Sequence, residues 1–420
     1  MGSVNFRLLK IKSWLITLPK KHEIFFITIF FVLGAANLAR VYVSWDGYLY
    51  LASAKALFRP EFFTNYHWIR EPLYPILLRL THIFLGSSDI GFALLNSSIL
   101  GLAIYFLLIK IRLQRYKIYA IYFLIYGNTL TIGFIGSILQ QVLIGANLIA
   151  IFTLGIIIYE NTYKKITKQD KIYIFAIALG TAINTFILYP VFCVIYLFAI
   201  VLQLYKRTLI KNGKLIIMSF IIFTITVLTW QIYKNENSQL TFGIFTDKIS
   251  PKSYSSSFRD PLIPKNEIFT GLLGLTSDVG ENDYFKSEIL TFGLGTENSG
   301  AENCGFFNTG EIKVVEYVDN YVTNSCKPTF FYKLLLYNQK ISLLFYHAVV
   351  LTLLIGNLLC LRKSRGLVVL VNLTCWTFFS VYFFFGMGIS RYIFPLYFLG
   401  VILIFSKNRI INTIRNYDYV

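Results

Sequence analysis

The chain has 420 residues, of which 56% are hydrophobic and only 14% are charged, and its mean hydropathy is +0.61. A soluble protein of this length carries far more charge, so these values exclude an ordinary soluble domain and indicate a membrane protein. The net charge of +18 also occurs in nucleic-acid-binding proteins, but the distribution of the basic residues along the chain, described below, excludes that class.

Ten apolar segments are predicted to be transmembrane helices, because they carry no charge over most or all of the length that a span needs. A helix crosses the hydrocarbon with about 20 apolar residues. The runs 118–159 and 172–205 are long enough for two spans each, folded back near Gly133–Gly136 and Asn184–Pro190. The fold class is therefore an all-α polytopic membrane protein. In chain order the segments are 24–39, 90–109, two in 118–159, two in 172–205, 215–233, 341–361, 366–390 and 392–406.

The basic residues concentrate in alternate connecting segments. With the N-terminus in the cytoplasm, the cytoplasmic segments contain the whole basic excess, as the positive-inside rule requires, and shifting the topology by one span destroys this pattern. Both termini are therefore predicted to be cytoplasmic, and residues 1–22 are predicted to lie at the membrane interface. The cytoplasmic segments are 1–23, 110–117, 160–171, 206–214, 362–365 and 407–420.

Two segments on the opposite, outer side are too long to be simple connectors. The first, 43–89, is typical of short amphipathic helices at the membrane surface, interrupted by prolines. The second, 234–340, is rich in Asn, Ser, Thr, Gly and acidic residues and is predicted to form a cap or a lid. The chain thus divides into an N-terminal membrane module (1–233), a periplasmic cap (234–340) and C-terminal membrane helices (341–420).

The cysteines divide between the membrane and the outer segment. Cys193, Cys360 and Cys375 fall in or at the end of apolar runs, where a thiol is usually a small hydrophobic group. Cys304 and Cys326 both fall in the outer segment, which faces an oxidising compartment, so a disulfide between them is predicted. That segment contains no histidine, and no zinc site is expected there. The chain also lacks the spacing of dinucleotide and P-loop motifs.

Asp46 is the first candidate for chemistry. It follows the first span, in the sequence SWDGYLY over 44–50. A carboxylate at a membrane interface can act as a general base or help to hold a metal ion. It can equally cap the surface helix that follows, which is a purely structural role.

Two arginines on the outer side are candidates for binding a phosphate. Arg391 opens the last span, in GISRYIFP over 388–395, and there it either has an anionic partner or extends to the interface. Its planar donor fork suits a phosphate. Arg70 lies in WIREPLYP over 68–75 and can clamp a phosphate, while His67 and Glu71 can contact sugar hydroxyls or carry protons. Alternatively, Arg70 and Glu71 form an exposed ion pair that contributes little to stability.

Taken together, these motifs resemble the GT-C glycosyltransferases, and most closely the bacterial superfamily of protein mannosyltransferases and aminoarabinose transferases. The resemblance covers the whole topology, and at residue level it rests on three short motifs. They are Asp46 with Tyr50 four residues later, Arg70 before a Pro-Leu-Tyr turn, and Arg391-Tyr392 with Pro395 at the head of the last span. The resemblance implies transfer of a sugar from a polyprenyl-phosphate-linked donor to a glycan, lipid or protein acceptor.

The resemblance also implies roles for individual residues. Asp46 corresponds to the catalytic base toward the acceptor hydroxyl, Arg70 to the contact with the donor phosphate, and Arg391 to a group that neutralises the lipid phosphate. Three positions depart from the family pattern: Gly47 replaces a second acid, Gln140-Gln141 replaces a glutamate, and Glu71 replaces a proline. The first departure leaves the need for a divalent cation open. Further substrate-contacting candidates are Tyr50, His67, Glu71 and Tyr392.

The sequence leaves two alternative functions open and indicates the membrane in which the protein resides. A polymerase of O-antigen or capsule repeat units shares the large outer loop, where Arg259-Asp260 would be its candidate residues. A lipid or solute transporter usually carries ionisable groups near the midplane of the membrane, whereas these spans are nearly free of charge. The outer loop has no Asn-x-Ser/Thr sequence, and the chain is rich in Lys, Ile, Phe and Tyr, which favours a bacterial inner membrane.

Overall fold

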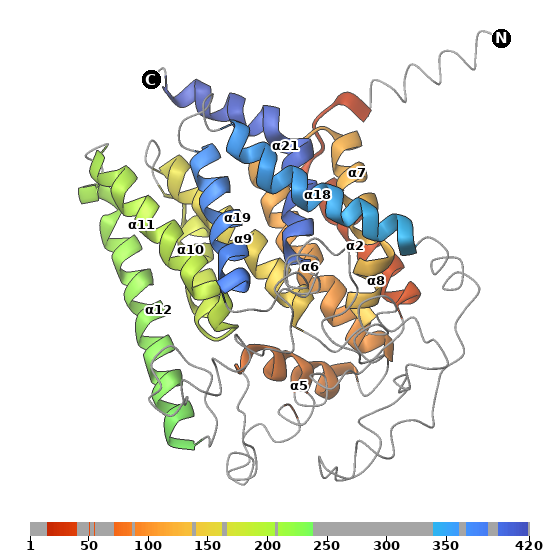
Figure 1. Cartoon of the computed structure of the whole chain (residues 1–420), viewed down its shortest axis with the longest axis horizontal. Coiled ribbons are helices and arrows are strands. Elements are labelled where there is room, and N and C mark those ends of the chain that lie inside the picture. The colour runs from red at the N-terminus through yellow and green to blue at the C-terminus, as the bar shows by residue number, and fades with distance from the viewer. Residues whose placement is uncertain are drawn as a thin grey trace, which may run out of the picture.

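The computed structural model describes residues 15–39, 50, 54, 71–85, 89–136, 140–161, 166–205, 209–237, 339–360, 367–384 and 394–418. These ranges contain helices and no β-strand, as the sequence predicts (Figure 1). The helices are α2 (Lys21–Leu38), α5 (Leu73–Leu85), α6 (Asp89–Ile111), α7 (Arg115–Tyr126), α8 (Thr129–Gly136), α9 (Gln141–Asn161), α10 (Lys168–Ala182), the 3₁₀ helix η1 (Phe186–Leu188), α11 (Tyr189–Tyr205), α12 (Leu209–Asn237), α18 (Gln339–Cys360), α19 (Leu367–Phe384) and α21 (Pro395–Asp418).

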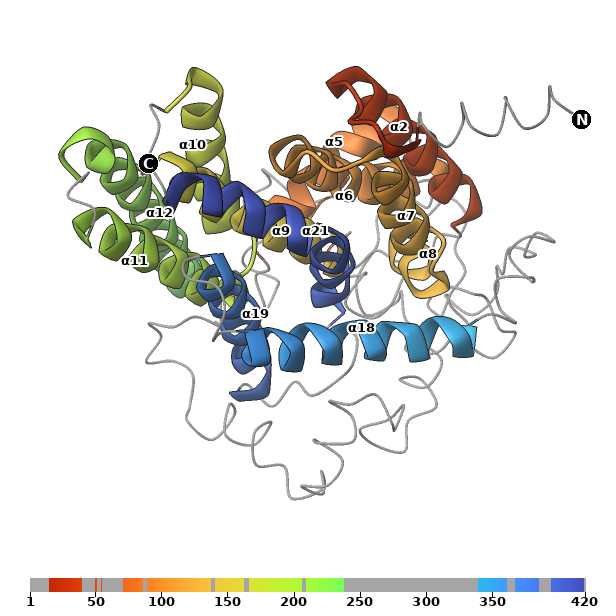
Figure 2. The same cartoon turned by 90° about the horizontal axis from the view of Figure 1, so that it is seen from above.

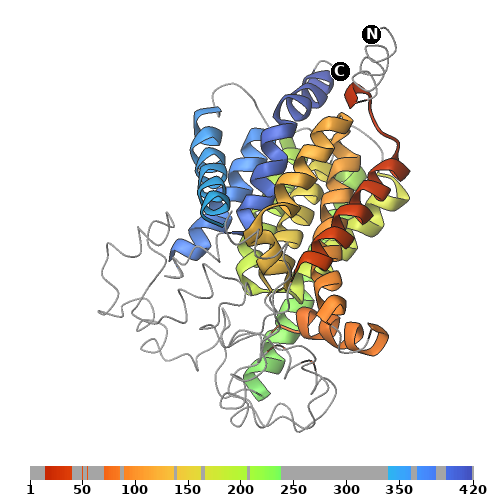
Figure 3. The same cartoon turned by 90° about the vertical axis from the view of Figure 1, so that its right-hand side faces the viewer.

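The long helices form one bundle with two distinct ends. The start of α2 and the end of α21 lie at the same end of this bundle (Figures 1 and 3). Helix α5 lies across the opposite end of the bundle (Figure 1), and we call this the α5 end. We call the other end the basic end, because the segments 110–117 and 160–171, which are rich in Lys and Arg, lie there. Helices α6 and α9 end in these segments, and helices α7 and α10 begin in them. The two ends of the chain thus lie on one side of the bundle, and their cytoplasmic location remains a prediction.

Several helices have the length and composition of membrane spans. Four of them, α2, α6, α9 and α12, are long and apolar enough to cross a bilayer, and the bent pair α7–α8 makes five if it counts as one span. Helices α11, α19 and α21 contain shorter apolar stretches. Peripheral helices expose large apolar side chains, such as Phe30 of α2, which is 71% exposed, and these suit lipid rather than water. The chain is therefore a helical membrane protein, and a helix occupies each predicted apolar segment, while the full number of spans stays a prediction.

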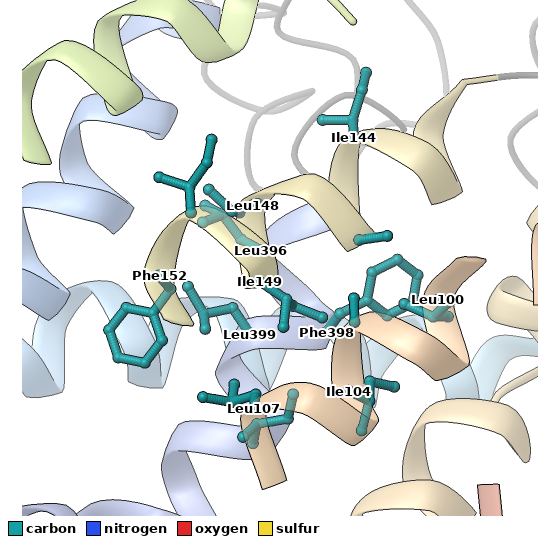
Figure 4. Packing of buried hydrophobic residues seen from close by; sticks show 14 of the residues in the cluster. Leu100, Ile104, Leu107, Ile144, Leu148, Ile149, Phe152, Leu396, Phe398 and Leu399 are labelled. Atoms are coloured by element: carbon teal, nitrogen blue, oxygen red, sulfur yellow. The ribbon is translucent and has the colours of Figure 1, made fainter. Parts of the chain in front are cut away.

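Helix α9 lies at the centre of the bundle. Its apolar window is buried along the whole length, and it packs against α6, α10, α11, α19 and α21. Figure 4 shows Leu148, Ile149 and Phe152 of α9 in one apolar cluster with Leu396 and Leu399 of α21 and with Ile104 and Leu107 of α6. Because α9 is surrounded by other helices, none of its faces is exposed to solvent, and its sequence accordingly carries no polar stripe.

Small residues let the neighbours of α9 approach its backbone closely. A Cβ atom added to Gly145 would lie 2.4 Å from Cδ2 of Phe398 on α21. A Cβ atom on Gly155 would lie 2.7 Å from Cδ1 of Leu370 on α19. Association of helices in a membrane depends on this kind of close packing, because burial in protein gains little over burial in lipid.

The third apolar segment is bent between α7 and α8, by 64°. Helix α7 ends at Gly127, and the side chain of Asn128 accepts a hydrogen bond from the backbone N–H of Leu130, 2.9 Å away, to begin α8. The hydroxyl of Tyr397 donates to the carbonyl of Leu124, at 2.6 Å, and accepts from Nδ2 of Asn128, at 3.2 Å. These bonds satisfy the backbone that the bend frees, as a broken membrane helix requires. The predicted fold-back at Gly133–Gly136 is thus helical in the structure, and the chain bends before it, at Gly127–Asn128.

A helix, α5, occupies part of the segment 43–89, for which surface helices are predicted; its location at a membrane surface stays a prediction. One face of α5 is buried, including Tyr74 and Leu78, whereas Ile83 and Phe84 are 61% and 78% exposed. An exposed apolar face on a helix that lies across the end of the bundle (Figure 1) is typical of a helix at a membrane interface. The backbone N–H of Leu73 donates to the carbonyl of Ile183, 3.1 Å away, and this bond ties the start of α5 to the turn between α10 and α11.

Candidate functional site

The structure describes part of the predicted site. Tyr50 and Glu71 are described, and so are Cys193 and Cys375, which are free thiols within their apolar helices, as expected. The remaining predicted roles are neither supported nor opposed by the structure. Asp46, His67, Arg70, Arg391, Tyr392, Cys304 and Cys326, together with Arg259-Asp260 of the alternative function, lie outside the described residues.

Tyr50 anchors the first outer segment to the α5 end. Its ring meets the ring of Tyr74 edge to face, with centroids 5.2 Å apart, a geometry that aromatic pairs favour. The two rings belong to a small apolar core that also contains Phe92 of α6 and Leu143 of α9. Tyr50 is almost fully buried in this core, so its role in this structure is packing, and its contact with a substrate remains a prediction.

A chain of hydrogen bonds continues from this core into the bundle. The hydroxyl of Tyr74 donates to Oδ1 of Asn96, at 3.2 Å, and Nδ2 of Asn96 donates to the carbonyl of Ile135, at 3.0 Å. These bonds join α5, α6 and α8. Sequence reasoning missed them, although an Asn within the uncharged run 90–109 is a signal, because a polar side chain in a membrane helix is usually hydrogen-bonded to a neighbouring helix.

The start of α21 packs against the same region. Phe394 lies directly before α21, three residues after Arg391 in the sequence. Its ring lies 4.6 Å from the ring of Phe134 on α8, centroid to centroid, and Phe134 adjoins Ile135. The described residues of the three motif segments, namely Tyr50, Glu71 and Phe394, are therefore all anchored at the α5 end.

Glu71 is a buried acid at this end. It is 7% exposed, and its carboxyl group lies close enough to the hydroxyl of Tyr189 for an electrostatic interaction. Because Leu73 is bonded to Ile183, Glu71 lies beside the turn that contains Asn184. A buried acid in a membrane protein is costly, and such residues usually serve a function.

Several buried polar atoms toward the α5 end have no hydrogen-bond partner, and on α19 the same is true of Nε1 of Trp376. Asn184 is 2% exposed, and neither its Nδ2 nor its Oδ1 atom has a hydrogen-bond partner. The same holds for both amide atoms of Gln231 on α12, for Oε1 of Gln141 at the start of α9, and for Oγ1 of Thr131 on α8. Each such atom costs about 1–3 kcal/mol, and native proteins contain few of them. Hydrogen-bonding groups that are left unused at one end of the bundle are what a site for a polar ligand offers.

The basic end has a different character, because two of its acids, Glu23 and Asp170, form ion pairs. Nη2 of Arg115 lies 2.6 Å from Oε2 of Glu23, and Lys110 forms an ion pair with Asp170. Partial burial alone would raise the pKa of the Asp170 carboxyl, but hydrogen bonds from Lys110 and Thr167 outweigh this effect and hold that pKa below its usual value. The pairs join the segments 1–23, 110–117 and 160–171, which the charge pattern assigns to one side of the membrane.

A metal centre is not formed by the described side chains. Within the described ranges, no group of three His, Cys, Asp or Glu residues lies close enough to hold a metal ion. The chemistry that the α5 end offers in these ranges is hydrogen bonding, from amides and hydroxyls, next to one buried carboxyl group. Comparisons of the chain with protein-family models, with curated proteins and with solved structures find no match.

Proposed function

We propose that the protein is a membrane glycosyltransferase that takes a sugar from a polyprenyl-phosphate-linked donor and transfers it to an acceptor at the outer face of a bacterial inner membrane. One observation carries most weight. The described residues of the three motif segments, Tyr50, Glu71 and Phe394, are held at one end of the bundle, together with buried amides that lack partners. At the other end, Glu23 and Asp170 form ion pairs with Arg115 and Lys110.

The arrangement suits a polar substrate that is attached to a lipid. Helix α5 presents an apolar surface at the bundle end, and an interfacial helix of this kind lies where a lipid-linked sugar phosphate would sit. The amide of Asn184 and the carboxyl group of Glu71 are next to this helix and are of the type that binds sugar hydroxyls. Asp46 is the proposed base, and Arg70 and Arg391 are the proposed contacts of the phosphate.

The test is an Asp46→Asn variant, which keeps the shape of the side chain and removes the base. A general base contributes about 10²–10⁴ in rate, so sugar transfer should fall at least about a hundredfold, while the amount of folded protein stays the same. The matched control is Asp418→Asn, the same chemical change at the last residue of α21, which lies at the basic end of the bundle. This variant should leave sugar transfer unchanged.

The readout is mass spectrometry of lipid-linked and surface glycans from cells that carry each variant. Loss of one sugar residue together with accumulation of its polyprenyl-phosphate donor supports the proposal and identifies the sugar. Single unpolymerised repeat units would assign the protein to the polymerases instead. A glycan profile that Asp46→Asn leaves unchanged refutes the catalytic role of Asp46 and makes a transporter the better interpretation.

A further inference from the structure

The connection between α6 and α7, at the basic end, contains an arginine in an unusual backbone conformation. Arg112 has a φ angle of 50°, and it is the one non-glycine residue with a positive φ in the described ranges. Its backbone N–H donates to the carbonyl of Leu108, 3.0 Å away, so it closes the C-terminal turn of α6. Glycine is the residue that normally occupies this position, because a side chain is disfavoured there.

Capping of α6 therefore does not account for the presence of an arginine side chain at position 112. It is exposed, so it adds nothing to the buried core. A residue kept in a disfavoured conformation often marks a functional site. Arg112 thus combines a strained backbone with an exposed guanidinium, at a position where glycine would cap the helix better.

The two ion pairs of the basic end place further cations on either side of Arg112. The pair between Lys110 and Asp170 brings the start of α10 to the end of α6. The pair between Arg115 and Glu23 brings the start of α2 to the start of α7. Figure 2, which views the molecule from this end, shows α6 between α10 and α2. The exposed cations of these elements are Lys20 and Lys21 at α2, and Lys168 and Lys171 on α10.

These exposed cations are not neutralised by the acids among them. The carboxyl groups of Glu23 and Asp170 are already bound by Arg115 and Lys110, which are the less exposed bases. The two ion pairs thus leave Arg112 and the exposed lysines with their positive charge. An anion that binds there meets several donors and no competing carboxylate from these two acids.

Apolar groups are exposed next to the same cations. Ile16 and Leu18 are 49% and 47% exposed, and Tyr116 at the start of α7 is 43% exposed. The hydroxyl of Thr17, between the first two, accepts a hydrogen bond from Arg115, which fixes this segment beside the turn. Cations, an aromatic ring and aliphatic side chains on one surface match the boundary between lipid headgroups and acyl chains.

We infer that Arg112, with the exposed lysines at the starts of α2 and α10, forms a binding site for the phosphate headgroup of an anionic phospholipid in the adjacent leaflet. The guanidinium of Arg112 binds the phosphate with its planar fork. The lysines add charge, and Ile16, Leu18 and Tyr116 contact the upper part of the acyl chains. This site lies at the end of the bundle opposite the proposed sugar site, and the inference holds whatever reaction the protein catalyses.

The test measures the affinity of the purified full chain in a neutral detergent for phosphatidylglycerol. Phosphatidylcholine serves as the zwitterionic lipid, and glycerol 3-phosphate as the soluble headgroup. Native mass spectrometry counts bound lipid, and the unfolding temperature is recorded with and without each additive. Phosphatidylglycerol should bind and raise the Tm, and the other two should do neither at the same concentration.

Two sets of variants identify the residues. Arg112→Gly should weaken binding of phosphatidylglycerol roughly fivefold, yet the lipid-free Tm should stay the same or rise, because glycine relieves the positive φ. The triple variant Lys20→Gln, Arg112→Gln, Lys171→Gln should weaken binding on the order of a hundredfold. The matched control neutralises Lys252, Lys265 and Lys286 of the predicted outer cap and should bind as the wild type does.

The inference is overturned if the triple variant keeps wild-type affinity or if the control loses as much as the triple variant. Equal binding of phosphatidylcholine would also overturn it, and so would equally tight binding of glycerol 3-phosphate, which would make this a site for a free phosphate. If Arg112→Gly lowers the lipid-free Tm and keeps the affinity, then Arg112 is a structural residue and the assignment is wrong.

Discussion

The bend between α7 and α8 offers the sharpest test of how the bundle is held together. Tyr397→Phe removes one hydroxyl and nothing else. That hydroxyl makes two hydrogen bonds, to the carbonyl of Leu124 and to the amide of Asn128, and both link α21 to the bent pair. Helix α21 is far away in the sequence, so these two bonds are a long-range constraint on the bend.

The magnitude follows from the two bonds. Hydrogen bonds between membrane helices contribute about 0.6 kcal/mol on average and at most about 1.7 kcal/mol, so losing two should cost about 1–3 kcal/mol. Asn128 is buried, and its amide would be left without this partner, which favours the upper half of that range. The cost should appear as a lower free energy of unfolding.

The assay is equilibrium unfolding of the purified protein in mixed detergent micelles, followed by circular dichroism. The control is Tyr116→Phe, which removes the hydroxyl of a residue that is 43% exposed and should leave the free energy of unfolding unchanged. A Tyr397→Phe protein that is as stable as the wild type would show that the bend does not depend on this hydroxyl. The account of how the freed backbone is satisfied would then be wrong.

Three further changes have defined expected outcomes. Gly145→Ala should lower the free energy of unfolding by about 1–3 kcal/mol, because its Cβ atom would overlap the ring of Phe398, whereas Gly34→Ala meets open space and should stabilise α2 slightly in the same unfolding assay. The pKa of Asp170 is lowered in the folded protein, so this carboxyl group stabilises the fold at a pH above its pKa in the unfolded chain. The stabilisation is lost as the pH falls through its pKa in the folded protein. Measurements of the free energy of unfolding against pH should show this loss below about pH 4 in the wild type and not in Asp170→Asn. Asn184→Leu removes two unpartnered polar atoms, so thermal unfolding should show unchanged or higher stability, and a loss of sugar transfer in the same variant would make Asn184 a ligand contact.

The positions of the helices were predictable because charge marks their limits. The uncharged runs end at Lys, Arg, Asp or Glu, and a membrane helix must exclude these groups over its whole length. The same charges predicted that 1–23, 110–117 and 160–171 lie on one side, and the ion pairs of Arg115 and Lys110 confirm that these segments meet. The break between α10 and α11 was also predictable, since Asn184 and Pro190 interrupt that run.

Details that depend on partners distant in the sequence were not predictable. The bend at Gly127–Asn128 persists because Tyr397, 269 residues beyond Asn128, satisfies the freed groups. No local pattern identifies such a partner. For the candidate site, the sequence predicted roles for Glu71 and Tyr50, which stay predictions, and it could not tell that Tyr50 is buried in a core with Tyr74. The amides of Asn184 and Gln231 were missed because a lack of hydrogen-bond partners is visible only in three dimensions.

The central place of α9 has a consequence for how the protein is made. The helices that enclose α9 include α19 and α21, which are synthesised about two hundred residues after it. During that interval the faces that they later cover are in contact with lipid or with the insertion machinery. Helix α9 tolerates this wait because it carries no charge from Gln141 to Tyr159, so that lipid and protein are nearly equivalent surroundings for it. Its composition is therefore suited to the order of membrane insertion as well as to the finished bundle, and a charged residue introduced there would act before the C-terminal helices arrive.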